Sequence, residues 1–340
     1  HFTIHSFPTR RSSDLVRSLA QSTLADEVSI HLCTGESVPR VLRRSRHVDG
    51  LHPLPEDLSR EERARTIDAV AAEIGAHVLF PTSVEGGRLI AQHRAIVGER
   101  AVIPVADPVT QQVASNKAHL VQVMEAYDIP HPPATSLHPR SSLASRLKGI
   151  PFPALVKPAV GEGGHHIYRF DDPEAVLRFA RTLPEDSQGY IVQTYIEGTD
   201  IDMSVLAMEG EVAAFTIQQG LRDDGEDDEF GPPAFIEFVD DPQVESVGRT
   251  VVKALQFTGL AHIDLRYDAS RSTVYVLEVN TRIWGSVLGS VRAGVNFPEL
   301  ACRAALGETV SEEAYENIRY AVGDLSLKRL GEVVRRGIPL

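Results

Sequence analysis

The sequence predicts an open parallel α/β domain followed by a larger unit of α+β character, and two observations support this fold class. In the first third of the chain, apolar runs of strand length alternate with helix-like patterns, which is typical of a parallel sheet. Beyond about residue 199, strand patterns follow one another through short turns, which indicates antiparallel pairing. The chain has 340 residues, 42% of them hydrophobic, enough for two or three domains.

The N-terminal α/β domain is expected over residues 16–108. Its clearest strand patterns are VSIHLCTG (28–35) and HVLFP (77–81), and a helix pattern from Arg60 to Ile74 leads through Gly75 into the second of them. Residues 1–15 stand where the first strand should be, but they show neither clean periodicity nor a capping signal. We expect this segment to be non-native sequence or a poorly ordered terminus, so that the sheet lacks its first strand.

A second unit is expected over residues 109–340. Its first part reads as a helix after SNK (115–117), then two strands joined by a glycine-rich turn, then a helix from Pro173 to Leu183. Its second part contains strands joined by turn residues and a final hairpin over 260–280. This order predicts two lobes, one before and one after about residue 196.

Composition and charge exclude several classes of function. The formal net charge is -13, and the basic residues are scattered, so no nucleic-acid partner is expected. Cys33 and Cys302 are the only cysteines, which favours neither a disulfide framework nor a zinc site and makes a reducing cytoplasm the expected location. No apolar run approaches the roughly 20 residues of a spanning helix, so no membrane partner is expected.

The most informative pair of residues is Asp264 and Glu278. The turn composition of 268–272 predicts a hairpin centred near Arg271, which places these two carboxylates opposite each other. Opposed like charges imply a cation between them or a raised pKa on one. Asn280 and Arg282 extend the same face, and oxygen ligands favour Mg²⁺, with Mn²⁺ as an alternative. A solvated hairpin face explains the spacing equally well.

Lys157 lies in an otherwise apolar strand pattern, where an ammonium group is costly unless an anion meets it. The adjoining Gly161, Gly163 and Gly164 would allow backbone N–H groups to approach phosphate oxygens. Taken alone, a glycine-rich hairpin turn is the simpler explanation of these glycines. Lys117 at a helix start is weaker still, because most such lysines are merely solvated.

The order of these segments resembles the ATP-grasp family over roughly two-thirds of the chain. The segments are SNK (115–117), VKP with GEGG (156–164), QTYIEGTD (193–200), HID (262–264) and EVNTR (278–282). The run from Asn280 to Leu300 is also similar to ATP-grasp carboxylate-amine ligases. The resemblance implies a pre-ATP-grasp domain over 16–108 and a two-lobed ATP-grasp fold over 109–340. The lid subdomain would span about 120–195, and the metal-binding subdomain about 196–310.

The same resemblance implies roles for individual residues. The metal ligands would be Asp264, Glu278 and Asn280, and Arg282 would meet the reacting carboxylate or the transferred phosphate, with Lys157 as its catalytic partner. The glycines would form a mobile lid. The residues implied in ATP binding are Lys117, Lys157, Gly161, Gly163, Gly164, Gln193, Tyr195, Ile196 and Asp200, the last as the ribose ligand. Family members commonly carry Glu where this chain has Gln193 and Asp200.

The function that follows is an ATP- and Mg²⁺-dependent ligase that joins a carboxylate to an amine through an acyl-phosphate. Two alternatives stay open, which are a catalytically inert nucleotide-binding module and phosphoryl transfer to a non-carboxylate acceptor. The sequence predicts small-molecule carboxylate and amine substrates without identifying them, and it does not predict the oligomeric state.

Overall fold

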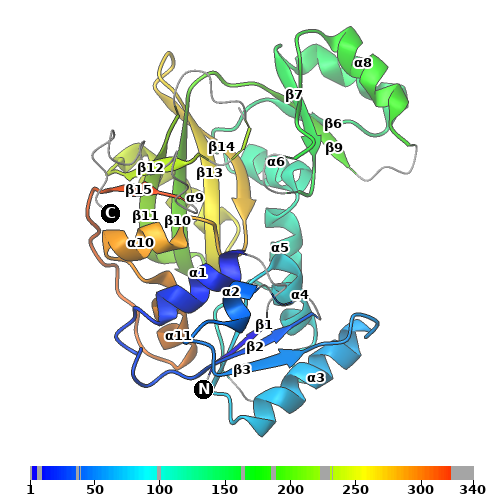
Figure 1. Ribbon diagram of the computed structural model, residues 1–340. Helices are drawn as coiled ribbons and strands as arrows, with labels where there is room; N and C mark the ends of the chain where they lie inside the picture. The colour runs from blue at the N-terminus through cyan, green and yellow to red at the C-terminus, as the bar shows by residue number, and fades with distance from the viewer. Residues whose placement is uncertain are drawn as a thin grey trace.

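The computed structural model describes residues 2–5, 10–35, 38, 40–97, 101–161, 165–184, 189–222, 230–231 and 233–322. The described chain contains three β-sheets with helices packed on them (Figure 1). This confirms the predicted combination of an N-terminal α/β domain with a two-lobed α+β unit. No described helix is both long enough and apolar enough to cross a membrane.

The N-terminal sheet has five parallel strands in the order β3-β2-β1-β4-β5. All four residues of β4 are buried, as expected for a strand covered on both faces. The elements are β1 (Phe2–His5), α1 (Arg10–Leu19), β2 (Ile30–Thr34), α2 (Arg40–Arg43), β3 (Gly50–Pro53), α3 (Arg60–Glu73), β4 (Val78–Pro81), α4 (Val84–Gln92) and β5 (Ala101–Val102).

The expectation that this sheet lacks its first strand is corrected. The backbone of β1 pairs in parallel with β2 on one side and with β4 on the other, so it is the central strand. Four residues are too few to show a reliable periodicity, and the pairing is created by two neighbours that lie far along the chain. Whether residues 1–15 are native remains a prediction that the fold does not test.

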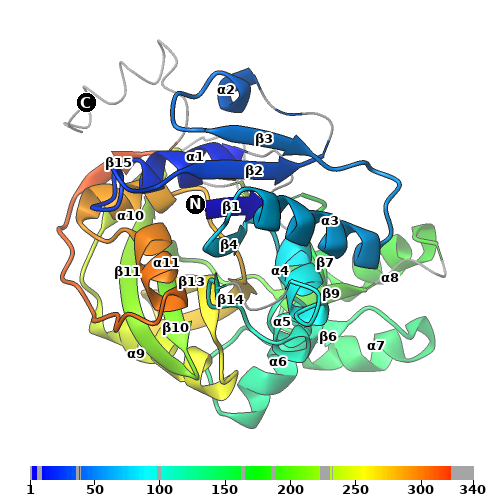
Figure 2. The ribbon, with the colours of Figure 1, turned by 90° about the horizontal axis from the view of Figure 1, so that it is seen from below.

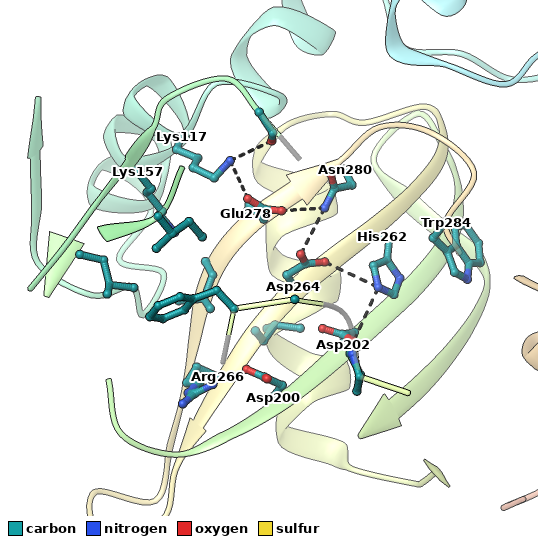
Figure 3. Close-up of a pocket in the computed structure, with 18 of the residues that line it drawn as sticks. Lys117, Lys157, Asp200, Asp202, His262, Asp264, Arg266, Glu278, Asn280 and Trp284 are labelled. Atoms are coloured by element: carbon teal, nitrogen blue, oxygen red, sulfur yellow. Dashed lines mark hydrogen bonds and ion pairs between the residues drawn. The ribbon is translucent and has the colours of Figure 1, made fainter. Parts of the chain in front are cut away.

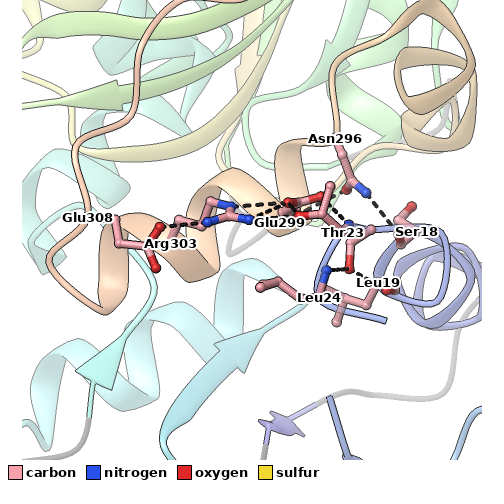
Figure 4. Close-up of polar contacts among 9 residues, drawn as sticks. Ser18, Leu19, Thr23, Leu24, Asn296, Glu299, Arg303 and Glu308 are labelled. Carbon is pink, nitrogen blue, oxygen red and sulfur yellow. Dashed lines mark hydrogen bonds and ion pairs between the residues drawn. The ribbon is translucent and has the colours of Figure 1, made fainter. Parts of the chain in front are cut away.

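Helix α1 ties this N-terminal region to the C-terminal helices. Its residues Leu15 and Leu19 are fully buried in one cluster with Trp284 and Phe297. Figure 4 shows the polar contacts beside this cluster, where the Glu299 carboxylate accepts hydrogen bonds from the amide and hydroxyl of Thr23 and from Arg303, and Asn296 donates to the Ser18 carbonyl. The segment 10–19 is therefore part of the folded core.

The second sheet is small and antiparallel, in the order β6-β9-β7-β8, and projects from the rest of the molecule (Figure 1). Its core is its own and includes Leu137, Val156, Val176 and Val192. The elements are α5 (Pro108–Ala114), α6 (Lys117–Ala126), β6 (Ala134–Ser136), α7 (Leu143–Arg146) with a short 3-10 turn on each side, β7 (Ala154–Pro158), β8 (Tyr168–Phe170), α8 (Pro173–Thr182) and β9 (Tyr190–Thr194).

The third sheet has six strands in the order β14-β13-β10-β11-β12-β15. Helix α9 packs on β10, β11 and β14, while α11 packs between the sheets, against β4 and β5 on one side and β10 and β13 on the other (Figure 2). The elements are β10 (Thr199–Met208), β11 (Glu211–Leu221), β12 (Phe235–Phe238), α9 (Pro242–Ala254), β13 (Gly259–Asp268), β14 (Thr273–Asn280), α10 (Val287–Ala293), α11 (Phe297–Ala305) and β15 (Arg319–Ala321). We keep the division into domains near residues 108 and 195 as a proposal.

Candidate active site

A pocket of about 350 Å³ lies where the small sheet faces the large one. One wall is formed by β7, the end of β9 and the start of α6, and the other by β10, β11, β13 and β14 (Figure 3). Nearly every residue singled out in the sequence lines this pocket. The exceptions are Gly163 and Gly164, which lie outside the described residues, whereas Gly161 is part of the lining.

The strand register places four polar side chains in one row across the large sheet. Glu278 on β14 pairs with Asp264 on β13, as the predicted hairpin required, Asp264 pairs with Asp202 on β10, and Asp202 pairs with Gln218 on β11. Directly opposed residues in antiparallel strands point to the same face. The row therefore gathers three carboxylates, although only two were predicted.

The Asn280 amide lies between the first two carboxylates. Its Nδ2 donates to Asp264 Oδ2 at 3.2 Å and to Glu278 Oε1 at 3.0 Å, and its Oδ1 accepts a hydrogen bond from Arg282 Nη2 at 3.1 Å. Asn280 is two residues from Glu278 on the same strand, so the two side chains share a face. The structure brings together all four residues predicted from the hairpin.

The two predicted lysines reach the same place from the other wall. Lys117 follows Asn116, whose side chain caps α6, and its Nζ lies 2.6 Å from Glu278 Oε2 and donates to the Gly161 carbonyl at 3.2 Å. Lys157 is the fourth residue of β7 and is only 5% exposed. Two buried ammonium groups therefore face the carboxylates across the pocket.

This arrangement shifts the ionisation of the central groups in opposite directions. Burial alone would raise the pKa of Glu278, but the charges of Lys117 and Lys157 lower it to about 2. The pKa of Asp264 is raised well above its usual range by burial and by the neighbouring carboxylates of Glu278 and Asp202. Burial and the charge of Lys117 lower the pKa of Lys157 to about 8.

The segment after β9 forms the side of the pocket where adenine is expected. Gln193 is 2% exposed and lines the pocket, and its Nε2 has no hydrogen-bond partner among the described residues. Arg266 donates from Nε to the Ile196 carbonyl at 3.0 Å and from Nη2 to the Tyr195 hydroxyl at 3.2 Å. An unpaired buried donor is unusual in a native structure, so Gln193 is suited to meeting a ligand acceptor.

Asp200, expected to bind the ribose, is engaged by two arginines. Its Oδ2 accepts a hydrogen bond from Arg222 Nε at 3.1 Å, and its Oδ1 accepts one from Arg266 Nη1. Both carboxylate oxygens therefore already have charged donors. A ribose contact from Asp200 would have to share these oxygens, so this role stays a prediction.

Sequence reasoning assigned no role to Asp202 and His262, although both line the pocket. His262 Nε2 lies 3.6 Å from an oxygen of Asp202 and 3.6 Å from one of Asp264, and its other ring nitrogen lies 2.9 Å from Ser204 Oγ. One signal was available, since positions 200, 202 and 204 alternate with apolar residues on one strand.

The residues present fit a divalent cation of the magnesium type. The predicted ligands offer only oxygen atoms once the Asn280 amide turns to present Oδ1, and hard cations prefer oxygen. Asp264 Oδ1 is buried without a hydrogen bond in the described part of the chain. Two opposed carboxylates, one of them with an oxygen that accepts no hydrogen bond, are the environment that a cation would relieve.

Comparisons with known proteins agree with this geometry. A family model described as an ATP-grasp domain matches residues 114–286, which is just over half of the chain and contains every predicted site residue. The chain belongs to the ATP-grasp family. This family match supports ATP and Mg²⁺ as its cofactors, as the motifs predicted.

Curated relatives are distant and much longer. The chain is 23% identical over 303 residues to the arginine-specific carbamoyl phosphate synthase large chain of Lactiplantibacillus plantarum, covering 86% of this chain but 27% of the relative. The Geobacillus stearothermophilus protein of the same name is 23% identical over 260 residues, covering 74% of this chain and 24% of the relative. The chain thus spans about a quarter of these relatives.

Solved structures share the fold at low identity. The biotin carboxylase–β-γ-ATP complex from Campylobacter jejuni superposes with a TM-score of 0.72 at 16% identity, covering 94% of this chain and 74% of that one. An L-amino acid ligase from Bacillus licheniformis gives 0.66 at 18% identity, with coverages of 90% and 73%. N5-carboxyaminoimidazole synthetase from Staphylococcus aureus gives 0.70 at 10% identity, with coverages of 98% and 84%.

Proposed function

We propose that this protein is an ATP-dependent ligase that joins a carboxylate to an amine through an acyl-phosphate and releases ADP and phosphate. The observation that carries the proposal is the opposed pair of Asp264 and Glu278, set against Lys117 and Lys157 across one pocket. A module that only bound nucleotide would not need two partly buried carboxylates held face to face.

The residues divide the work of phosphoryl transfer between them. Lys117 and Lys157 would bind phosphate oxygens of ATP, and Asp264, Glu278 and Asn280 would hold Mg²⁺. When bound, the metal neutralises charge that develops on the phosphate oxygens. Without substrates, Glu278 Oε2 lies 2.6 Å from Lys117 Nζ, so the carboxylate and the ammonium group are already positioned before substrates bind.

The reaction has two balanced steps. A carboxylate oxygen attacks the γ-phosphorus of ATP, the bond to the β-phosphate oxygen breaks, and ADP leaves. The amine nitrogen then attacks the acyl carbon, and the bond from that carbon to the phosphate oxygen breaks. Of the two protons that an ammonium group loses on becoming an amide, one ends on hydrogen phosphate and the other in solvent. Arg282 would orient the attacking carboxylate.

The proposal that a carboxylate accepts the phosphoryl group rests mainly on Arg282. Its guanidinium group lies beside the metal set, because Nη2 donates to Asn280 and Nη1 to the Ile283 carbonyl at 3.2 Å. A planar guanidinium group matches a carboxylate better than it matches a hydroxyl group. The expected partners are accordingly small carboxylates and amines, and the expected location is the cytoplasm.

The test is substrate-dependent ADP release in the presence of Mg²⁺. Acetate, succinate, N-acetylated amino acids and the twenty standard amino acids serve as acids, with amino-acid amides as amines that cannot act as acids. Hydroxylamine is added separately to trap an acyl-phosphate as a hydroxamate. ADP release that needs an acid, together with a hydroxamate, is the expected result. ADP release without a hydroxamate would indicate a non-carboxylate acceptor, and none at all with any acid would indicate an inert module.

A further inference from the structure

One part of the pocket is lined by residues other than those proposed to bind ATP or the metal. In the row across the large sheet, Glu278 and Asp264 belong to the metal set, whereas Asp202 and Gln218 continue the row onto β10 and β11. Figure 3 shows Asp202 and His262 on the side of Asp264 that is turned away from Lys117. This far end of the pocket, defined by Asp202, Gln218, His262, Trp284 and Ser286, contains none of the residues to which we assign a role in phosphoryl transfer.

Asp202 is held by neutral or weakly basic groups. Gln218 Nε2 donates to its Oδ2 at 3.2 Å, and His262 Nε2 lies 3.6 Å from the same oxygen. Within the described ranges, no lysine or arginine nitrogen lies within 4 Å of this carboxylate, although its side chain is only 14% exposed. A largely buried carboxylate without a cation is unfavourable, so the position favours binding of one.

The side chains around Asp202 are oriented by hydrogen bonds and by a ring contact. Gln218 is oriented by Ser286, whose hydroxyl donates to Gln218 Oε1 at 2.8 Å. His262 is held by Ser204 at 2.9 Å and stacks on Trp284, with 5.6 Å between ring centroids and 13° between ring planes. Trp284 is 2% exposed and lines the pocket, and its Nε1 has no acceptor in the described part of the chain. A preorganised wall with an unused donor is suited to a polar ligand.

We propose that Asp202 receives the amine substrate in its ammonium form and that Asp202 sets the specificity for a cationic amine. This rests on the proposed function. The ammonium group would meet Asp202 within the pocket that also contains Arg282 and the phosphate-binding lysines, so the nitrogen would be held close to the acyl-phosphate. It would attack the acyl carbon after losing one proton to solvent. Carboxylate and amine would thus be recognised by charges of opposite sign in one cavity.

The test compares two nucleophiles in Asp202→Asn. Amino-acid amides present an ammonium group, whereas hydroxylamine is uncharged near neutral pH and needs no carboxylate partner. We expect the KM for the amide to rise about 10- to 100-fold, because a charge-assisted hydrogen bond is lost. The KM for the acid, the Mg²⁺ requirement and hydroxamate formation should be unchanged. Asp26→Asn, at an exposed position in the N-terminal region, is the matched control and should match the parent protein throughout.

Several outcomes would overturn the inference. A raised Mg²⁺ requirement in Asp202→Asn, with the KM for the amide unchanged, would make Asp202 a metal ligand. An equal loss with both nucleophiles would make its role structural. Failure of the proposed function is distinguishable, since the parent protein would then release no ADP with any acid. If Asp202→Asn does not fold, Asp202→Ser removes the same carboxylate and gives the same comparison.

Discussion

The two ends of the pocket differ in how their carboxylates are satisfied. At the end near the small sheet, Glu278 meets Lys117 at 2.6 Å, and the charges of Lys117 and Lys157 lower its pKa to about 2. At the far end, Asp202 lies beside Gln218, His262 and the carboxylate of Asp264, and no lysine or arginine nitrogen of the described residues lies within 4 Å of it. One end therefore contains its own cations, and the other offers a carboxylate to a cation from outside.

This difference indicates what each end can bind. The polyphosphate of ATP brings negative charge together with a divalent cation. At the end near the small sheet, the lysines can pair with the phosphates and the carboxylates can bind the cation, which replaces the ion pairs that these side chains make with one another. A substrate that brings only positive charge would be repelled there. Such a substrate would be favoured at Asp202. The pocket would thus bind ATP at one end and the cationic amine at the other, according to the sign of their charge.

The largest effect is expected from Glu278→Gln. The substitution keeps the shape of the side chain but removes a charge that Lys117 and the metal both require. Mg²⁺-dependent ADP release should fall by at least about 100-fold, while the protein stays folded in thermal unfolding. Glu125→Gln, at an exposed position on α6, is the matched control. A fully active and more stable Glu278→Gln protein would make the pair an ordinary repelling face.

A smaller effect is expected from Lys157→Ala, which removes one of the two cations at the phosphate end. ATP affinity measured by calorimetry should weaken by roughly 1.5–3 kcal/mol, the contribution of a hydrogen bond to a charged group. Lys148→Ala, at an exposed position before β7, serves as the control. Unchanged affinity in a folded Lys157→Ala protein would contradict the assignment of this end to phosphate.

The smallest effect on binding is expected from Asp200→Asn, two residues before Asp202 on β10. Asp200 already accepts hydrogen bonds from Arg222 and Arg266, so it offers little to a substrate. The melting temperature should fall, while the KM values for ATP and for the amine change by less than about tenfold. A KM effect on the amine as large as that of Asp202→Asn would remove the contrast between the two residues. A large effect on ATP alone would support the ribose role.

The sequence predicted the parts of the site that depend on local geometry. The turn composition of residues 268–272 predicted the hairpin and its approximate register, since Asp268 pairs with Thr273 across the turn. A register shift between Asp264 and Leu265 then moves the pairing by one residue and brings Asp264 opposite Glu278. Lys157 could be identified because an ammonium group stands out in an apolar strand. In both cases the signal lies within about 15 residues of the chain.

The remaining features depend on contacts between distant segments. Lys117 meets Glu278 across the space between two sheets, and Asp202 joins the row only because β10 pairs with β13. The central position of β1 likewise depends on β2 and β4. Helix α1 buries Leu15 beside Trp284, so removing residues 1–15 should disturb a core that also supports the pocket.

The central claim, an acyl-phosphate formed on the acid, is tested most directly by isotope transfer. An acid that supports ADP release is labelled with ¹⁸O in both carboxylate oxygens, and the phosphate released during ligation is analysed by mass spectrometry. We expect each phosphate to carry one labelled oxygen, because the carboxylate oxygen attacks phosphorus and stays with it when the amine displaces phosphate. Unlabelled phosphate, formed together with the ligated product, would contradict the acyl-phosphate and with it the proposed mechanism.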